Sequence, residues 1–258
     1  MPKLFVLSDV HGFYDEMKKA LDDAGFDENN PEHWLIGCGD FMDRGSQPVQ
    51  VMRYLCNLPQ KILIRGNHEK LIEDCCYRGE AWTHDVSNGT ARTIWDIASG
   101  HITDFPEMCD YTLKRTKAFR DSMVNYLETK NYIFVHSWIP VINKDGLPAH
   151  YTRGRSFEVN SDWRNASQKE WDDATWGNPF DMAARGLNQT GKTIVFGHWH
   201  CSAGWAEKEG RSEFGSDAKF DPYHGDSFIA IDACTAHTYK VNVLVLEDEF
   251  LEVNNGNE

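Results

Sequence analysis

The chain has 258 residues, of which 41% are hydrophobic, and it carries 40 acidic against 26 basic side chains for a formal net charge of −14. This length and apolar content suffice for one α/β domain with a full hydrophobic core. The acidic excess argues against a nucleic-acid partner, because a nucleic-acid groove needs a basic surface. It leaves anionic substrates open, since bound cations can dominate the local charge of a site.

Five short apolar runs read as buried strands, and each ends at a polar residue that is followed by a turn. In chain order they cover residues 3–8, 34–38, 62–64, 132–135 and 193–196. In an open α/β sheet, ligands bind in the crevice outside the carboxyl ends of the strands. We therefore expect the polar residues at these five ends to form one site.

Two helices are predicted between the first three strands. An apolar stripe at helical spacing consists of Met17, Ala20, Leu21 and Ala24. Gly25 is placed to end that helix, and Pro48 stands where the first turn of the next helix would start. Residues up to about 75 therefore read β-α-β-α-β-α, which implies right-handed crossovers and a largely parallel sheet.

Two further strands are predicted near the C-terminus. They cover residues 228–231 and 241–246, and little room remains for a helix between them. Parallel strands need a long crossover, whereas antiparallel strands can follow each other closely. We therefore expect both strands in a second, more antiparallel sheet.

The polar residues at the strand ends belong to five motifs that occur in one order along the chain. They are Asp9-Val10-His11, Gly39-Asp40-Phe41-Met42-Asp43-Arg44-Gly45, Gly66-Asn67-His68-Glu69, His136 alone, and Gly197-His198-Trp199-His200. Taken singly, each would fit a surface turn, a salt-bridged loop or a buried core histidine. Together they supply the carboxylate, imidazole and amide ligands that divalent metal ions accept. Two such ions about 3.5–4 Å apart can acidify a water molecule and clamp the phosphoryl oxygens of a phosphate ester.

This series of motifs resembles the calcineurin-like metallophosphoesterases, and its Asp-Arg-Gly and Asn-His-Glu forms resemble the phosphoprotein-phosphatase-like branch of that family. The resemblance implies an α/β fold in which two mixed β-sheets pack face to face with helices outside. It also implies hydrolysis of a phosphate ester by direct attack of a metal-bridging hydroxide, with no covalent enzyme intermediate.

The resemblance assigns the metal ligands residue by residue. Asp9 and His11 hold the first ion, Asp40 bridges both ions, and Asn67, His136 and His198 hold the second. His200 stays open, because the wider family uses the second histidine of Gly-His-X-His on the first ion, whereas the phosphatase branch often lacks it. The implied cofactors are two divalent ions, manganese first, with iron, zinc, nickel or cobalt as alternatives.

The candidate catalytic residues are Arg44, His68 and Asp43. The guanidinium fork of Arg44 matches two phosphoryl oxygens, and Asn67 would also contact the phosphate. His68 is the candidate general acid for the leaving oxygen. Asp43 would orient the His68 ring and raise its pKa.

The chain departs from the family pattern in two places. Ser137-Trp138 follows the fourth-motif histidine, where relatives have a small or glycine pair, so Trp138 would narrow the pocket, stack on an aromatic substrate or pack in the core. Asp232-Ala233-Cys234 stands where the branch has Asp-Thr-Gly. The branch also uses a second phosphate-binding arginine, for which the sequence offers Arg153, Arg155, Arg164 and Arg185 without choosing among them.

We expect one domain over residues 1–253 and a short tail at 254–258. Two segments between the motifs read as inserts that cap the site. One is 77–130, which is mostly helical, and the other is 143–191, which is polar and rich in tryptophan. The tryptophans of the second insert read as core residues, or as a stacking surface for a nucleobase or aromatic side chain; they are Trp163, Trp171 and Trp176.

Three functions remain open, and the substrate is correspondingly a phosphorylated protein or a nucleotide. The first is a phosphatase for phosphate monoesters, with phosphoserine or phosphothreonine in proteins as the substrate. The second is a bis(5'-nucleosyl)-tetraphosphatase of the same fold, since Phe196-Gly197-His198-Trp199 looks like that group's form of the fifth motif. The third is a non-catalytic scaffold, against which His68 and Arg44 argue, because a scaffold has no use for a proton donor.

The sequence predicts a cytoplasmic protein without a membrane partner. The N-terminus has no cationic and apolar leader, and no apolar run approaches the length of a membrane helix. Seven cysteines without Cys-X-X-Cys spacing suggest reduced thiols. No feature of the sequence fixes the oligomeric state.

Overall fold

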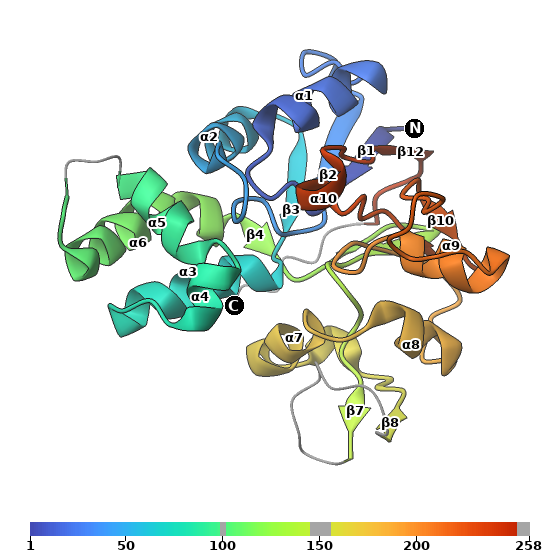
Figure 1. The fold of residues 1–258 in the computed structure, drawn as a ribbon. Helices are drawn as coiled ribbons and strands as arrows, with labels where there is room; N and C mark the ends of the chain where they lie inside the picture. The colour runs from blue at the N-terminus through green and yellow to red at the C-terminus, as the bar shows by residue number, and fades with distance from the viewer. Residues whose placement is uncertain (99–101, 145–155, 252–258) are drawn as a thin grey trace.

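Two five-stranded sheets form the centre of the computed structural model, which describes residues 1–98, 102–144 and 156–251 (Figure 1). In spatial order the first sheet consists of β12 (Leu244–Glu247), β1 (Lys3–Leu7), β2 (His33–Gly37), β3 (Lys61–Ile64) and β4 (Met123–Val124). The second consists of β10 (Tyr223–His224), β11 (Phe228–Ala230), β9 (Thr193–Phe196), β6 (Tyr132–Phe134) and β5 (Leu127–Glu128). A separate hairpin pairs β7 (Ile142–Asn143) with β8 (Phe157–Glu158).

The helices surround this pair of sheets (Figure 1). Beside the first sheet lie α1 (Tyr14–Asp23), α2 (Pro48–Asn57), α3 (Asn67–Arg78), α4 (Thr83–Ser87), α5 (Thr90–Ala98) and α6 (Phe105–Asp121). Beside the second lie the 3₁₀ turn η1 (Trp163–Asn165), α7 (Gln168–Ala174), α8 (Pro179–Ala184) and α9 (Ser202–Glu209), and the short helix α10 (Thr235–Thr238) precedes β12 in the chain. No helix of the described residues is both long and apolar enough to span a membrane.

The first sheet is buried on both faces, which explains why its strands read as continuous apolar runs. β1 pairs in parallel with β2, β2 with β3 and β3 with β4. Because successive side chains of a strand point to opposite faces, Leu4 and Val6 pack between the two sheets. Phe5 and Leu7 pack on the other face, beneath the helices. The predicted β-α-β-α-β-α start is confirmed, including Pro48 in the first turn of α2.

The core between the sheets is built from both of them. The first sheet and the turns that follow it contribute Leu4, Val6, Ile36, Cys38 and Ile64; the second contributes Leu127, Phe134, Val195, Ile229 and Ile231. The second sheet is mixed, because β9 pairs in parallel with β6 and β11, whereas the edge strands β5 and β10 run antiparallel. The expected fold of two mixed sheets packed face to face with helices outside is confirmed.

The expectation for the C-terminal strands is wrong in one respect. The strands over 228–231 and 241–246 were expected in the same sheet, but β11 lies in the second sheet and β12 in the first. The helix α10 separates them and lets the chain cross from one sheet to the other. β12 then pairs antiparallel with β1, where Leu244 and Leu246 reach the core between the sheets.

Residues 77–130 contribute to the hydrophobic core and to both sheets. They hold α4, α5 and α6, and Ile94, Ile97 and Phe119 join the core cluster beneath the first sheet. They also hold β4 and β5, which are edge strands of different sheets. The expected tail at 254–258, and residues 145–155 of the segment 143–191, lie outside the described residues.

Candidate functional site

The polar residues at five strand ends meet between the two sheets. Asp9, Asp40 and Asn67 follow strands of the first sheet, and His136 and His198 follow strands of the second. Hydrogen bonds join the two groups directly: the backbone N–H of His198 donates to Asp9 Oδ2 (2.9 Å). His136 Nδ1 lies 2.8 Å from the carbonyl oxygen of Cys38. The structure therefore brings the residues at these strand ends together.

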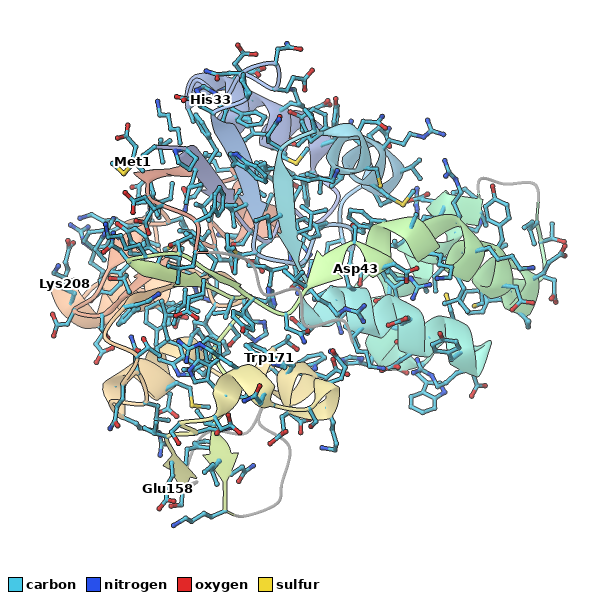
Figure 2. All side chains as sticks on the ribbon, turned by 180° about the vertical axis from the view of Figure 1, so that it is seen from behind. Met1, His33, Asp43, Glu158, Trp171 and Lys208 are labelled. Carbon is cyan, nitrogen blue, oxygen red and sulfur yellow. The ribbon has the colours of Figure 1, made fainter. Side chains whose placement is uncertain are left out.

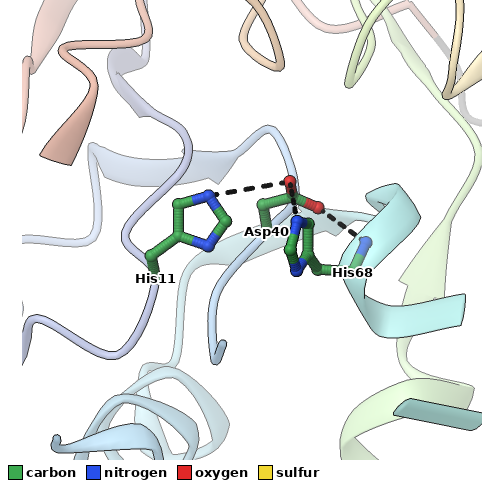
Figure 3. A group of neighbouring side chains, drawn as sticks. All are labelled: His11, Asp40 and His68. Carbon is green, nitrogen blue, oxygen red and sulfur yellow. Dashed lines mark hydrogen bonds and ion pairs between the residues drawn. The ribbon is translucent and has the colours of Figure 1, made fainter. Parts of the chain in front are cut away.

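Asp40 stands at the centre of the site. Its Oδ2 lies 3.8 Å from His11 Nε2 and 3.9 Å from His68 Nε2, and Figure 3 shows the three side chains together. Its Oδ1 lies 3.5 Å from His136 Nε2. Two groups of possible metal ligands occur among the described residues, each with its ligand atoms within 4.8 Å of one another. One consists of His11, Asp40 and His68, and the other of Asp40, His136 and His198. Asp40 belongs to both groups.

Asn67 completes the side of the site formed by His136 and His198. Its Oδ1 lies 2.8 Å from His136 Nε2 and 3.0 Å from His198 Nδ1, and the two imidazole nitrogens lie 3.2 Å apart. Because a carbonyl oxygen only accepts, the contact with Cys38 assigns the proton of neutral His136 to Nδ1. Its Nε2 then presents a lone pair beside the amide oxygen and the second imidazole, as metal-binding histidines do.

The electrostatics of this cluster suit divalent cations. Burial raises the pKa of Asp40, but the imidazoles around it outweigh burial and hold the pKa below its ordinary value. Burial, helped by His136, lowers the pKa of His198 to about 3. Burial, Asp232 and Asp40 together raise the pKa of Asp9 well above its ordinary value. Buried carboxylates that repel one another, together with several imidazoles, form a donor set that a divalent ion satisfies.

The turns that carry these residues use unusual backbone conformations. Several site residues have positive φ, from 50° at Asp9 and His11 to 75° at Arg44. Gly197 permits the approach of the sheets, because a Cβ there would overlap Asp9 Oδ2 and Ser8 Oγ. Gly66 permits a close approach within the first sheet, because a Cβ there would overlap Asp40 Oδ1 in the turn after β2. These two glycines therefore let neighbouring turns come into contact, one across the two sheets and one within the first sheet.

His68 and Asp43 form a hydrogen-bonded pair beside Asp40. His68 Nδ1 lies 2.8 Å from Asp43 Oδ2, and both side chains are buried. Burial lowers the pKa of His68, but the carboxylates of Asp40 and Asp43 outweigh burial and leave the pKa above its ordinary value. Arg44 lies at the mouth of the site, with Nη1 2.8 Å from His11 Nε2 and Nη2 3.1 Å from His68 Nε2. The three candidate catalytic residues are thus in mutual contact.

His200 lies apart from the two ligand groups. Its Nδ1 is 2.8 Å from Ser202 Oγ and its Nε2 is 3.2 Å from Glu213 Oε1. Asp9 lies closer to the centre, with Oδ1 3.9 Å from His11 Nε2. The geometry therefore groups Asp9 with the predicted ligands and leaves His200 with α9 and its neighbours.

Two of the four candidates for the second phosphate-binding arginine face other partners. Arg164 makes two 2.7 Å hydrogen bonds to Glu128, and Arg185 Nε donates to Asp181 at 2.9 Å. The other two, Arg153 and Arg155, lie outside the described residues.

The tryptophans occupy two different environments. Trp138 is buried in the core and packs against Phe196. Trp163 and Trp171 are buried in the same core cluster. Trp176 is half-buried, and its ring centroid lies 6.5 Å from that of His198. The core interpretation therefore holds for the first three.

Glu69 supports the site, although the sequence analysis gave it no role. Its carboxylate accepts three backbone N–H bonds, from Asp40 (3.0 Å), Phe41 (2.9 Å) and Gly66 (2.9 Å). It thereby ties the turn after β2 to the start of α3. The available signal was its fixed place in the Asn-His-Glu motif, two residues after a predicted ligand.

A cysteine stands where the phosphatase branch has the glycine of Asp-Thr-Gly. Cys234 adopts a φ of +53°, in the left-handed region that favours glycine. The turn is held by Asp232, whose Oδ1 accepts the backbone N–H of Cys234 at 2.6 Å. The backbone of this turn thus takes the glycine conformation without the glycine.

Known proteins resemble this chain in sequence over part of its length and in fold over most of it. Symmetrical bis(5'-nucleosyl)-tetraphosphatases of Hamiltonella defensa and Aeromonas salmonicida are 36% identical over 66 residues and 37% identical over 70 residues. These matches cover 25% and 27% of this chain, and 23% and 24% of the two relatives. The chain therefore spans about a quarter of the length of these relatives.

Among solved structures, a mutant of a cold-active protein tyrosine phosphatase superposes with a TM-score of 0.52 at 16% identity, over 96% of this chain and 76% of that one. A likeness at this identity shows the fold alone. The model of the family described as calcineurin-like phosphoesterase matches residues 2–202, which include every predicted ligand. The chain belongs to the calcineurin-like phosphoesterase family.

Proposed function

We propose that the chain is a phosphatase dependent on two metal ions that hydrolyses phosphate monoesters, with phosphoserine and phosphothreonine in proteins as the first candidate substrates. The observation that carries the proposal is the position of Asp40, a buried carboxylate shared by two groups of imidazoles. A carboxylate in that position suits the bridging of two ions. The hydrogen-bonded pair of His68 and Asp43 beside it supplies a proton donor.

The donor atoms fit two divalent ions, and manganese is the first candidate. The first ion would be held by Asp9, His11 and Asp40, and the second by Asp40, Asn67, His136 and His198. When bound, such ions acidify a water molecule and neutralise phosphoryl oxygens. The raised pKa of Asp9 supports the assignment. Without a cation nearby, the buried charge of Asp9 is repelled by the carboxylates of Asp232 and Asp40.

The remaining steps fall to the side chains. The Arg44 guanidinium, which contacts His11 and His68, would bind two phosphoryl oxygens and orient the phosphate. His68 Nδ1 is engaged by Asp43, so Nε2 is the nitrogen that faces the site and would pass its proton to the leaving oxygen. The raised pKa of His68 keeps more of it protonated near neutral pH.

A second candidate is the symmetrical cleavage of dinucleoside tetraphosphates. Its support is the set of curated relatives that carry this name, at 36% identity over 66 residues. The matches cover about a quarter of each relative, so the substrate of those proteins is a candidate for this chain and no more. Both candidates use the same metal core and the same proton donor.

The experiment is a parallel assay of the manganese-loaded protein on a phosphothreonine peptide and on diadenosine tetraphosphate, with His68→Asn as the control. We expect turnover of the peptide to exceed that of the dinucleotide, and His68→Asn to lower it by about 10²–10⁴-fold. Preference for the dinucleotide would move the function to the second candidate. Activity on neither, or full activity in the variant, would contradict the proposal.

A further inference from the structure

Thr90, the first residue of α5, contacts the pair of His68 and Asp43. The hydroxyl of Thr90 donates a hydrogen bond to Asp43 Oδ2 at 2.6 Å. The same oxygen lies 2.8 Å from His68 Nδ1. An ionised carboxylate only accepts, so the hydroxyl must be the donor. Both Thr90 and Asp43 are fully buried, and neither family nor motif assigns Thr90 a part in the site.

These two bonds restrain the Asp43 carboxylate through one of its oxygens. Its other oxygen, Oδ1, is buried and has no hydrogen-bond partner among the described residues. Without the Thr90 hydroxyl, His68 would be the sole hydrogen-bond partner of the Asp43 carboxylate among the described residues. The carboxylate could then rotate together with the His68 ring. Loss of the hydroxyl would thus loosen the ring that carries the proton.

The fold brings this contact about through the residue before Thr90. Gly89 has a φ of +84°, and a Cβ there would lie 2.6 Å from the backbone nitrogen of Arg44 and 2.9 Å from its Cα. Only glycine lets the chain come so close. Gly89 therefore packs on the backbone of Arg44, while the Thr90 hydroxyl binds the carboxylate of Asp43. Figure 2 shows Asp43 beside the helical segment that contains α5.

We infer that Thr90 is a positioning residue that holds Asp43, and through it His68, in the geometry for proton donation. The inference rests on the proposed phosphatase function. Misplacing a reacting group by about 1 Å can cost as much as 10²-fold in rate. Loss of the Thr90 hydroxyl should therefore lower the rate on substrates whose leaving group needs a proton. It should not lower the rate on substrates whose leaving group departs without one.

Thr93 supplies a matched control on the same helix. It is buried to the same degree as Thr90, with 1% against 0% exposed. Its hydroxyl has no hydrogen-bond partner among the described residues. Thr93→Val therefore measures the cost of the substitution itself in this helix, without disturbing Asp43.

The test compares Thr90→Val, Thr90→Ser and Thr93→Val as full-length, manganese-loaded proteins. The substrates are phenyl phosphate, whose leaving group needs a proton, and 2,4-dinitrophenyl phosphate, whose leaving group does not. We expect Thr90→Val to lower kcat on phenyl phosphate by about 10-fold or more, with KM and the kcat on the dinitrophenyl ester within about twofold. Thr90→Ser and Thr93→Val should keep both rates.

Equal losses on the two esters in Thr90→Val, or the same loss in Thr93→Val, would overturn the inference. A second readout, recorded with diamagnetic zinc in place of manganese, is the proton resonance of His68 Nδ1–H, assigned with His68→Asn. It should shift or broaden in Thr90→Val and stay in place in Thr90→Ser and Thr93→Val; an unchanged resonance in Thr90→Val would overturn the inference. If the unsubstituted protein hydrolyses neither ester, the proposed function fails, and this resonance alone decides the role of Thr90.

Discussion

At the scale of single residues, the site depends on buried side chains that fix backbone turns. Glu69 is one, because its carboxylate accepts backbone N–H bonds from Asp40, Phe41 and Gly66. Burial, followed by repulsion from Asp40, raises its pKa to about 7, and the three hydrogen bonds oppose that rise. Such a group is costly to bury and is retained for what it positions.

Glu69→Gln is expected to destabilise the protein and weaken metal binding. A glutamine amide offers one acceptor oxygen in place of two, so at least one of the three backbone N–H groups loses its partner, at about 1–3 kcal/mol. Urea unfolding and manganese titration would measure both effects. Asp74→Asn on the same helix is the control, because its partly exposed pair with Lys70 should contribute less than about 1 kcal/mol. Equal stability of Glu69→Gln and the parent would contradict the role.

Sequence motifs predicted the residues of the site better than their supports. The predicted ligands follow strands, so apolar runs and the residues that end them identify candidates such as Asp40 and His136 without a structure. The contact of Thr90 with the site and the burial of Glu69 depend on which segments of the chain pack together. The contact of Thr90 with Asp43 joins residues 47 positions apart in the chain, and no local pattern contains it.

At the scale of elements, Asp248 ties the end of β12 to the turn between β5 and β6. It accepts hydrogen bonds from Thr129 Oγ1 (2.6 Å), and from the backbone N–H (2.8 Å) and side-chain amide (2.7 Å) of Asn131. Burial alone would raise the pKa of Asp248, but these hydrogen bonds outweigh it and hold the pKa below its ordinary value. The residue thus links a strand of the first sheet to a hairpin of the second.

Asp248→Asn is expected to lower the free energy of unfolding at pH 7 by about 1–3 kcal/mol, because an amide leaves one of these donors unpaired. A carboxylate with a depressed folded pKa contributes stability above its unfolded pKa of about 3.9 and loses it as pH falls through the folded pKa. The difference between the parent and the variant should therefore narrow toward pH 3. Denaturant unfolding from pH 7 to pH 3 measures it. Glu249→Gln, exposed and adjacent, is the control, and a constant difference across this range would contradict the link.

The same element shows what sequence patterns leave undetermined. The apolar pattern located β11 and β12 within a few residues, but it did not name their partners. The pairing follows from the free edge of β1, where Leu244 and Leu246 reach the core between the sheets. Period-2 patterns report which residues are buried, whereas strand order depends on edges that form only when the rest of the sheet exists.

At the scale of the whole molecule, the predicted ligands come from both sheets, so metal binding should stabilise the fold. A ligand that binds the folded state at 100 times its Kd adds about 2.7 kcal/mol. We expect manganese to raise the Tm, and Asp40→Asn to abolish most of the rise. His200→Asn should keep it, because His200 contacts Ser202 and Glu213. Differential scanning fluorimetry with manganese and then a chelator measures this, and loss of the rise in His200→Asn would make His200 a ligand.

The positive φ angles of the site set stability against activity. Among the described residues, those with positive φ that are not glycine include Asp9, His11, Asp40, Arg44 and His198. A left-handed residue with a Cβ costs about 1–2 kcal/mol, so these five together cost about as much as the whole net stability of a typical domain, about 5–15 kcal/mol. Glycine would relieve the cost at each position and remove the chemistry with it. Selection for heat resistance alone would therefore favour glycine at these positions, whereas the proposed hydrolysis requires the side chains that glycine would remove.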